Sequence, residues 1–111
     1  MILNKPNLLC VDDEVNNLDA LERIFRKQYN VIKASSANEA FELLAQYEEL
    51  PIIISDQRMP EVSGVEFLEK SIKTHPDTIR ILLTGYTDID SVIDSVNKGQ
   101  IYRYLTKPWD T

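Results

Sequence analysis

Five short apolar runs alternate with four stretches of helical periodicity along this chain. The runs cover residues 8–11, 29–34, 52–54, 78–84 and 101–105. Between them, apolar side chains recur every three or four residues, which is typical of helices that bury one face. Alternation of strands and helices at this spacing implies right-handed crossovers between parallel strands, with helices on both faces of one sheet. The sequence therefore predicts an α/β fold.

The predicted helices each carry an apolar stripe that is expected to face the sheet. The stripes comprise Val15, Leu18, Leu21 and Phe25; Ala37, Ala40, Phe41 and Leu44; Val65, Leu68 and Ile72; and Ile89, Val92, Ile93 and Val96. Ser36 and Glu39 form a capping box that starts the second helix. Ser63 and Glu66 repeat this pattern at the start of the third. Pro76 is expected to end the third helix, because proline cannot continue one.

The simplest arrangement of these elements is a doubly wound, five-stranded parallel sheet in the flavodoxin-like order 2-1-3-4-5. The more polar second run is expected at an edge of this sheet. A fifth helix would normally follow the fifth strand, but the sequence stops at Thr111, so we expect this helix to be missing or truncated. An apolar face around Ile101, Leu105 and the inner side of the first helix would then be uncovered. We expect either a fragment of a longer protein or a homodimer that covers this face.

Composition limits the classes of function open to this chain. Its 111 residues suit one domain, covering 1–111, with a sizeable core. The formal net charge of -6 argues against direct binding of nucleic acid, which needs a basic face. The single cysteine, Cys10, excludes an internal disulfide and suits a core position. No segment resembles a membrane helix or a signal peptide, so we expect a cytoplasmic protein that does not bind membranes.

Ionisable and hydroxyl residues stand where four of the predicted strands end. They are Asp12 and Asp13 after the first strand, Asp56 after the third, Thr84 at the end of the fourth, and Lys107 after the fifth. Parallel strands all end at one edge of a sheet, and the predicted strand order brings these residues together. Each has a structural explanation on its own: Asp56 can be a turn residue, Asp13 a helix cap and Lys107 a solvated cation. Their joint placement favours a functional site.

The groups gathered at this edge suit phosphoryl transfer. Three carboxylates in one cleft repel one another, and Mg²⁺ relieves this because it prefers oxygen ligands. No histidine or thiol is positioned there for a softer metal. Lysine and threonine side chains can stabilise the charge of a transferred phosphoryl group. Asp56 is the best candidate for the nucleophile, since it stands alone after the central strand, whereas the adjacent Asp12 and Asp13 suit metal binding.

The residues at these strand ends resemble those of the receiver domain of two-component response regulators. The matching motifs are Val-Asp-Asp-Glu at 11–14, Ser-Asp-Gln-Arg-Met-Pro at 55–60 with Gly64 behind it, Leu-Thr-Gly-Tyr at 83–86 and Tyr-Leu-Thr-Lys-Pro at 104–108. The resemblance covers the whole chain in the right order and spacing. It implies a phosphorylation-controlled signalling switch, in which Asp56 accepts a phosphoryl group from a sensor histidine kinase or a phosphotransfer protein.

The resemblance also implies how the site is assembled. Asp12, Asp13, Asp56 and the backbone carbonyl of Arg58 would hold Mg²⁺. Lys107 would contact the acyl phosphate. Such a domain is not an enzyme in the ordinary sense, because it catalyses only its own phosphorylation and dephosphorylation.

A further set of residues would report and time the phosphorylated state. By the same resemblance, Thr84 and Tyr104 would form a switch that relays phosphorylation to an output domain or a downstream protein. Arg58 and Tyr86 would flank the path of attacking water and slow autodephosphorylation. Partner choice is expected on the first helix, at Asn16, Asn17, Leu18 and Leu21.

Two other functions stay open. The chain can be a receiver-like interaction module that phosphorylation does not regulate, although the complete set of site residues argues against this. It can also be a small phosphatase with an aspartyl intermediate, but such enzymes typically place a second acid where this chain has Arg58. The Leu-Thr-Gly-Tyr and Lys-Pro-Trp variants resemble receivers joined to enzymatic output domains, such as cyclic-dinucleotide phosphodiesterases. The sequence names neither the kinase, nor the signal, nor the output.

Overall fold

A parallel sheet flanked by helices forms the framework of the computed structural model, which describes residues 5–84 and 103–106. The elements are β1 (Asn7–Val11), α1 (Val15–Phe25), β2 (Asn30–Ala34), α2 (Ala37–Gln46), β3 (Ile52–Asp56), α3 (Gly64–Ser71), β4 (Ile79–Thr84) and β5 (Arg103–Thr106). The strands lie in the order β2-β1-β3-β4-β5. The predicted flavodoxin-like α/β class with a parallel sheet is confirmed. The predicted helix with Ile89, Val92, Ile93 and Val96, and the question of a fifth helix, fall outside the described residues.

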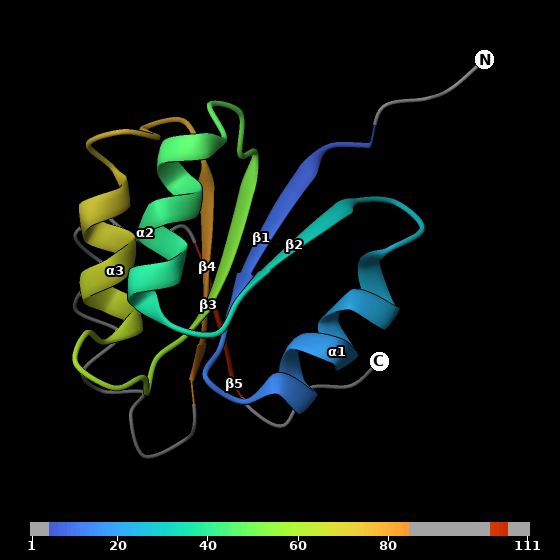
Figure 1. Cartoon of the computed structure of the whole chain (residues 1–111), viewed down its shortest axis with the longest axis horizontal. Helices are drawn as coiled ribbons and strands as arrows, with labels where there is room; N and C mark the ends of the chain where they lie inside the picture. The colour runs from blue at the N-terminus through green and yellow to red at the C-terminus, as the bar shows by residue number, and fades with distance from the viewer. Residues whose placement is uncertain (1–4, 85–102, 107–111) are drawn as a thin grey trace.

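Helices cover both faces of the sheet (Figure 1). α2 and α3 lie on one face and α1 lies on the other. The cluster on the α2 and α3 side comprises Leu9, Val11, Ala34, Ala40, Leu44, Leu50, Ile53, Phe67, Leu68 and Leu82. The cluster on the α1 side comprises Leu8, Cys10, Leu18, Leu21, Ile54 and Leu83. Successive residues of β1 and β3 alternate between the two clusters, because neighbouring side chains of a strand point to opposite faces. None of the described helices is long and apolar enough to cross a bilayer.

The prediction that the second strand lies at an edge is confirmed. Among the described strands, β2 pairs only with β1. Its Lys33 contacts two acids of α1, with Nζ at 3.4 Å from Asp19 Oδ1 and 2.9 Å from Glu22 Oε1. A charged side chain on an edge strand discourages pairing with other chains.

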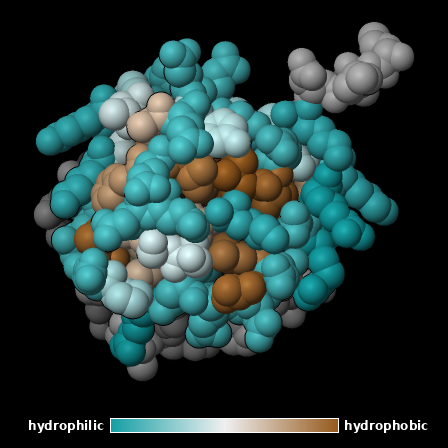
Figure 2. Space-filling view, in the orientation of Figure 1, coloured by the Kyte–Doolittle hydropathy of each residue, from teal (hydrophilic) through white to brown (hydrophobic). Residues whose placement is uncertain are grey.

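Seen in the orientation of Figure 1, the molecule has a hydrophobic surface at the centre, surrounded by hydrophilic residues (Figure 2).

Two helices differ from the predicted apolar stripes. Val15 is 60% exposed, because it opens α1 at the rim of the sheet and burial in this helix begins only at Leu18. Val65 in α3, and Ile72 directly after its end, are half-buried rather than central to the packing. The residues of α3 that are fully buried are Gly64, Phe67, Leu68 and Ser71. They follow the helical period, but glycine and serine do not count as apolar in a sequence pattern. α3 also ends at Ser71, well before Pro76.

A buried polar network joins α3 to the start of β4. Arg80 is only 4% exposed, and its Nε donates to Ser71 Oγ at 2.8 Å. Its Nη1 donates to the Thr78 carbonyl at 2.8 Å, and its Nη2 donates to the His75 carbonyl. The His75 Nε2 lies 2.7 Å from the Tyr47 carbonyl, just after α2. The apolar pattern around position 80 predicted a strand correctly but gave no sign of this network.

Candidate functional site

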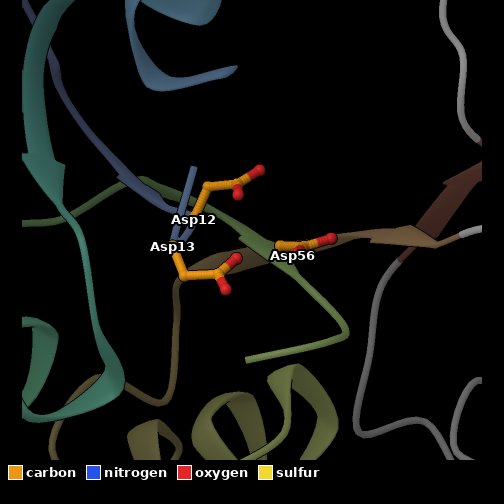
Figure 3. A group of neighbouring side chains, drawn as sticks. All are labelled: Asp12, Asp13 and Asp56. Carbon is orange, nitrogen blue, oxygen red and sulfur yellow. The ribbon is translucent and has the colours of Figure 1, made fainter. Parts of the chain in front are cut away.

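Three carboxylates meet at the carboxyl edge of the sheet (Figure 3). Asp56 is the last residue of β3, and Asp12 and Asp13 follow β1 directly. One side-chain oxygen from each lies within 4.8 Å of those of the other two. Asp12 is fully buried, Asp56 is 5% exposed, and Asp13 is exposed. The structure therefore brings together the three acids that the strand ends predicted.

The pairing of the strands explains why these acids meet. β1 and β3 are neighbours, with Val11 opposite Ser55, so the next residues along the chain, Asp12 and Asp56, lie side by side at the edge of the sheet. On the other flank of β3, Asp56 pairs with Leu83 of β4. The cluster is thus set by the register of the central strands, because a slip of one residue would turn these side chains to the opposite face.

Asp12 is fixed by the start of α1. Its backbone N–H donates to the Ala34 carbonyl at 3.1 Å. Its Oδ1 accepts the Glu14 N–H at 2.9 Å, and its Oδ2 accepts the Asn17 Nδ2 at 3.2 Å. The alternative reading of Asp13 as the cap of the first helix is wrong. Glu14 occupies the N-cap position of α1, and its side chain makes no capping hydrogen bond. The backbone N–H of Glu14 is itself bound by Asp12.

Asp56 is fixed through its backbone. Ser55 Oγ donates to the Asp56 carbonyl at 3.0 Å. The N–H of the next residue, Gln57, donates to the Leu83 carbonyl at 3.0 Å. A Cβ atom on Gly64 would overlap the Asp56 carbonyl oxygen and would lie 2.7 Å from Leu82 Cδ1. Glycine is therefore required at position 64 for α3 to begin this close to Asp56.

The donor set of the cluster fits a hard cation. All three members offer carboxylate oxygens, which are ligands that Mg²⁺ prefers. Three carboxylates this close repel one another, and a cation between them relieves the repulsion. The buried thiol of Cys10 does not belong to this group of possible ligands. The arrangement of acids thus fits Mg²⁺ on chemical grounds.

The remaining predicted site residues are placed to different extents. The Arg58 side chain is exposed, and its backbone carbonyl stands two residues beyond Asp56. Thr84 is the last residue of β4, directly after the partner of Asp56, and Tyr104 lies in β5 opposite Leu82. Lys107 and Tyr86 lie outside the part of the chain that the structure describes.

Two side chains at the site had no predicted part in it. Asn17 was assigned only to a partner-recognition surface, yet it donates to Asp12. Gln57 was read only as part of a motif, yet its Oε1 accepts the Val65 N–H at 2.9 Å. An amide one turn into the helix after a paired-acid motif could have suggested the first contact. No local signal marks the second, because its two partners are eight residues apart.

Comparison with known proteins gives a consistent family. A family model described as the response regulator receiver domain matches residues 8–111. The chain is 43% identical over 105 residues to the hydrogenase transcriptional regulatory protein HoxA of Cupriavidus necator, covering 95% of this chain and 22% of that protein. It spans about a fifth to a quarter of the length of the curated relatives it matches.

Two solved structures show the same fold. One is the signal receiver domain of an HD domain-containing protein from Pseudomonas fluorescens, with a TM-score of 0.86, 36% identity, and coverage of 96% of this chain and 86% of that one. The other is a response regulator from Burkholderia pseudomallei with a phosphorylated aspartic acid and a calcium ion. It has a TM-score of 0.83 and 28% identity, and the match covers 96% of this chain and 62% of that one.

Proposed function

This chain belongs to the response regulator receiver domain family, and from that premise we propose that Asp56 accepts a phosphoryl group from a sensor histidine kinase or a phosphotransfer protein. The observation that carries this proposal is the cluster of Asp12, Asp13 and Asp56 at the carboxyl edge of the sheet. Both carboxylate oxygens of Asp12 accept hydrogen bonds that set the start of α1, which suits a fixed ligand more than a nucleophile. Asp56, at the end of the central strand, is the better nucleophile.

The proposed reaction is a direct displacement at phosphorus. A carboxylate oxygen of Asp56 forms the new O–P bond while the N–P bond of the phosphohistidine breaks, and the leaving imidazole takes up a proton. Asp12, Asp13, Asp56 and the backbone carbonyl of Arg58 would hold Mg²⁺, which supplies positive charge against the transferred oxygens when bound. We assign Lys107 to the same charge stabilisation. The chain catalyses only its own phosphorylation and dephosphorylation.

We further propose that Thr84 and Tyr104 relay the phosphorylated state. A phosphoryl group adds a charge near -2 and three acceptor oxygens, which favours any conformer that places a donor beside it. Thr84 follows the residue paired with Asp56, and Tyr104 lies in the neighbouring strand, so their backbone positions support this assignment. The competing function, a receiver-like interaction module without phosphorylation, lacks an explanation for the carboxylate cluster.

The whole protein is proposed to be larger than this receiver. The relatives' lengths support a regulator in which residues 1–111 form the receiver domain and an output domain, or a downstream protein, receives the signal. Within the receiver, we propose the full 2-1-3-4-5 sheet, a helix that carries Ile89, Val92, Ile93 and Val96, and a homodimer that covers the apolar face around Ile101, Leu105 and the inner side of α1. We place this receiver in the cytoplasm and propose that residues 1–111 make no direct contact with nucleic acid or membrane.

Incubation with acetyl phosphate, or with the fluoroberyllate mimic, in the presence of Mg²⁺ tests this proposal. We expect a stable adduct by mass spectrometry that is lost in Asp56→Asn. Absence of an adduct on the unmodified chain would instead support the interaction module. Repeated turnover of unrelated phosphate esters would support a phosphatase.

The lifetime of the adduct should depend on two positions. We propose that Arg58 and Tyr86 hinder the approach of water to the acyl phosphate. An Arg58→Ala, Tyr86→Ala double variant should then lose its phosphoryl group faster than the unmodified chain, measured as decay after removal of acetyl phosphate. Unchanged or slower decay would contradict this assignment.

A further inference from the structure

Gln57 joins three elements immediately beside the proposed phosphoacceptor. Its backbone N–H donates to the Leu83 carbonyl of β4 at 3.0 Å. Its backbone carbonyl accepts the Gly64 N–H at 2.9 Å, and its side-chain Oε1 accepts the Val65 N–H, also at 2.9 Å. The residue that follows Asp56 thus binds both β4 and the first two residues of α3.

The side chain of Gln57 acts as a second cap of α3. A helix leaves its first N–H groups without partners inside the helix. Ser63 Oγ accepts the Glu66 N–H at 3.2 Å, as in an ordinary capping box. Gln57 satisfies the Val65 N–H from outside the helix, across the loop at 58–63. The half-buried position of Gln57 limits the water that could replace this bond.

These bonds close the loop that follows Asp56. The loop at 58–63 leaves β3 at Gln57 and returns to it at Gly64 and Val65, so its two ends are held together. At this point Gly64 also lies against the Asp56 carbonyl, where no Cβ would fit. A shift of α3 would therefore move the backbone of Asp56 and the loop together. Arg58, whose carbonyl is a proposed metal ligand, is the first residue of that loop.

We propose that Gln57 is a positioning residue, whose side chain holds Asp56 and the Arg58 carbonyl in the geometry needed to bind Mg²⁺. This inference rests on the proposed function. Loss of Oε1 would leave the Val65 N–H without its partner and would loosen the loop. Metal affinity would fall because part of the binding free energy would then go into ordering the ligands.

The test compares two variants that each remove one acceptor at the start of α3. Gln57→Leu removes the acceptor beside Asp56. Ser63→Ala removes the acceptor of the Glu66 N–H, and the Ser63 side chain bonds Glu66 rather than the residue next to Asp56. We expect Gln57→Leu to weaken Mg²⁺ binding about fivefold by calorimetric titration. Phosphorylation by acetyl phosphate at subsaturating Mg²⁺ should slow to a similar degree. Ser63→Ala should stay within twofold of the unmodified chain in both measurements.

Two further measurements separate positioning from loss of folding. Amide hydrogen exchange at Val65 should accelerate in Gln57→Leu more than in Ser63→Ala. Gln57→Glu keeps an acceptor oxygen and adds a negative charge beside Asp56, so it should bind Mg²⁺ at least as tightly as the unmodified chain. Equal Mg²⁺ affinity in Gln57→Leu and Ser63→Ala, with both folded by circular dichroism, would overturn the inference while Asp56 is still phosphorylated. Failure of the unmodified chain to bind Mg²⁺ or to form the adduct would overturn the proposed function itself.

Discussion

At Gly64, the absence of one carbon atom decides how closely α3 can approach the proposed phosphoacceptor. A Cβ there would overlap the Asp56 carbonyl oxygen, which belongs to the backbone and cannot rotate away. The neighbouring Leu82 side chain is itself fully buried, so it has little room to move. The site therefore depends on a residue that carries no functional group.

Substitution of this glycine should be costly. We expect Gly64→Ala to lower the free energy of unfolding by about 1–3 kcal/mol, as overpacking of a core position does. The exposed Lys70 of the same helix offers a matched control, and Lys70→Ala should change stability by less than about 0.5 kcal/mol. Urea denaturation measures both, and equal stability of the two variants would contradict the close approach.

The buried thiol of Cys10 should make the free energy of unfolding depend on pH in alkaline solution. Its thiol has an ordinary pKa of 9.0, and burial, then the charges of Asp12 and Glu22, raise the pKa to about 12 in the folded protein. Between these values the unfolded chain releases a proton that the folded chain keeps. Stability conferred by the protonated thiol is thus complete below about pH 9 and is lost as the pH rises toward 12.

The measurement compares the unmodified chain with Cys10→Ala. At neutral pH the alanine variant should be less stable, because it leaves a small cavity in the core. Above pH 9 the difference in unfolding free energy between the two proteins should shrink and then reverse. Each unit of pKa shift corresponds to about 1.4 kcal/mol. A difference that stays constant from pH 7 to pH 11 would show that the thiol does not carry the effect.

At the scale of elements, α3 is held at both of its ends by polar groups. At its start, Ser63 and Gln57 accept hydrogen bonds from the Glu66 and Val65 N–H groups. At its end, Ser71 Oγ donates to the Leu68 carbonyl at 2.6 Å and accepts the Arg80 Nε. α3 is therefore tied to Gln57, directly after β3, and to β4 by polar contacts as well as by its apolar face.

Removal of the Arg80 guanidinium should loosen the C-terminal end of α3. Arg80→Met keeps the length of the side chain but leaves Ser71 and the His75 and Thr78 carbonyls without their donor. Burial lowers the pKa of Arg80, because the charged guanidinium is poorly solvated there. Removal of this buried charge therefore offsets part of the stability lost with the hydrogen bonds. We expect a net destabilisation of about 2 kcal/mol by urea denaturation. The exposed Arg23 is the control, and an equal effect of Arg23→Met would refute the network.

At the scale of the whole molecule, stability and metal binding should be linked. The carboxylate cluster exists only when β1 and β3 are paired, so the unfolded chain has no such site. A ligand that binds only the folded state stabilises it. At a Mg²⁺ concentration ten times its dissociation constant, the free energy of unfolding should rise by about 1.4 kcal/mol.

This increment should disappear when the cluster loses one acid. Asp13→Asn removes an exposed ligand without disturbing the hydrogen bonds of Asp12, and it also relieves repulsion in the metal-free protein. Thermal denaturation with and without Mg²⁺ measures the increment. Asp77→Asn, an exposed acid outside the cluster, should keep it. A similar response of both variants would mean that Mg²⁺ acts on the protein as a whole.

The order of elements and the place of the acids follow from the sequence because both are local properties. Apolar runs and helical stripes depend on neighbours a few residues apart, and the handedness of crossovers then brings the strand ends together. This is why the α/β class and the cluster of Asp12, Asp13 and Asp56 could be predicted. Only the tertiary structure decided which face of α3 is buried, that Gly64 lies against the Asp56 carbonyl, and that Gln57 binds the start of α3. Those contacts arise from how closely a helix packs on a sheet, which no periodicity in the chain records.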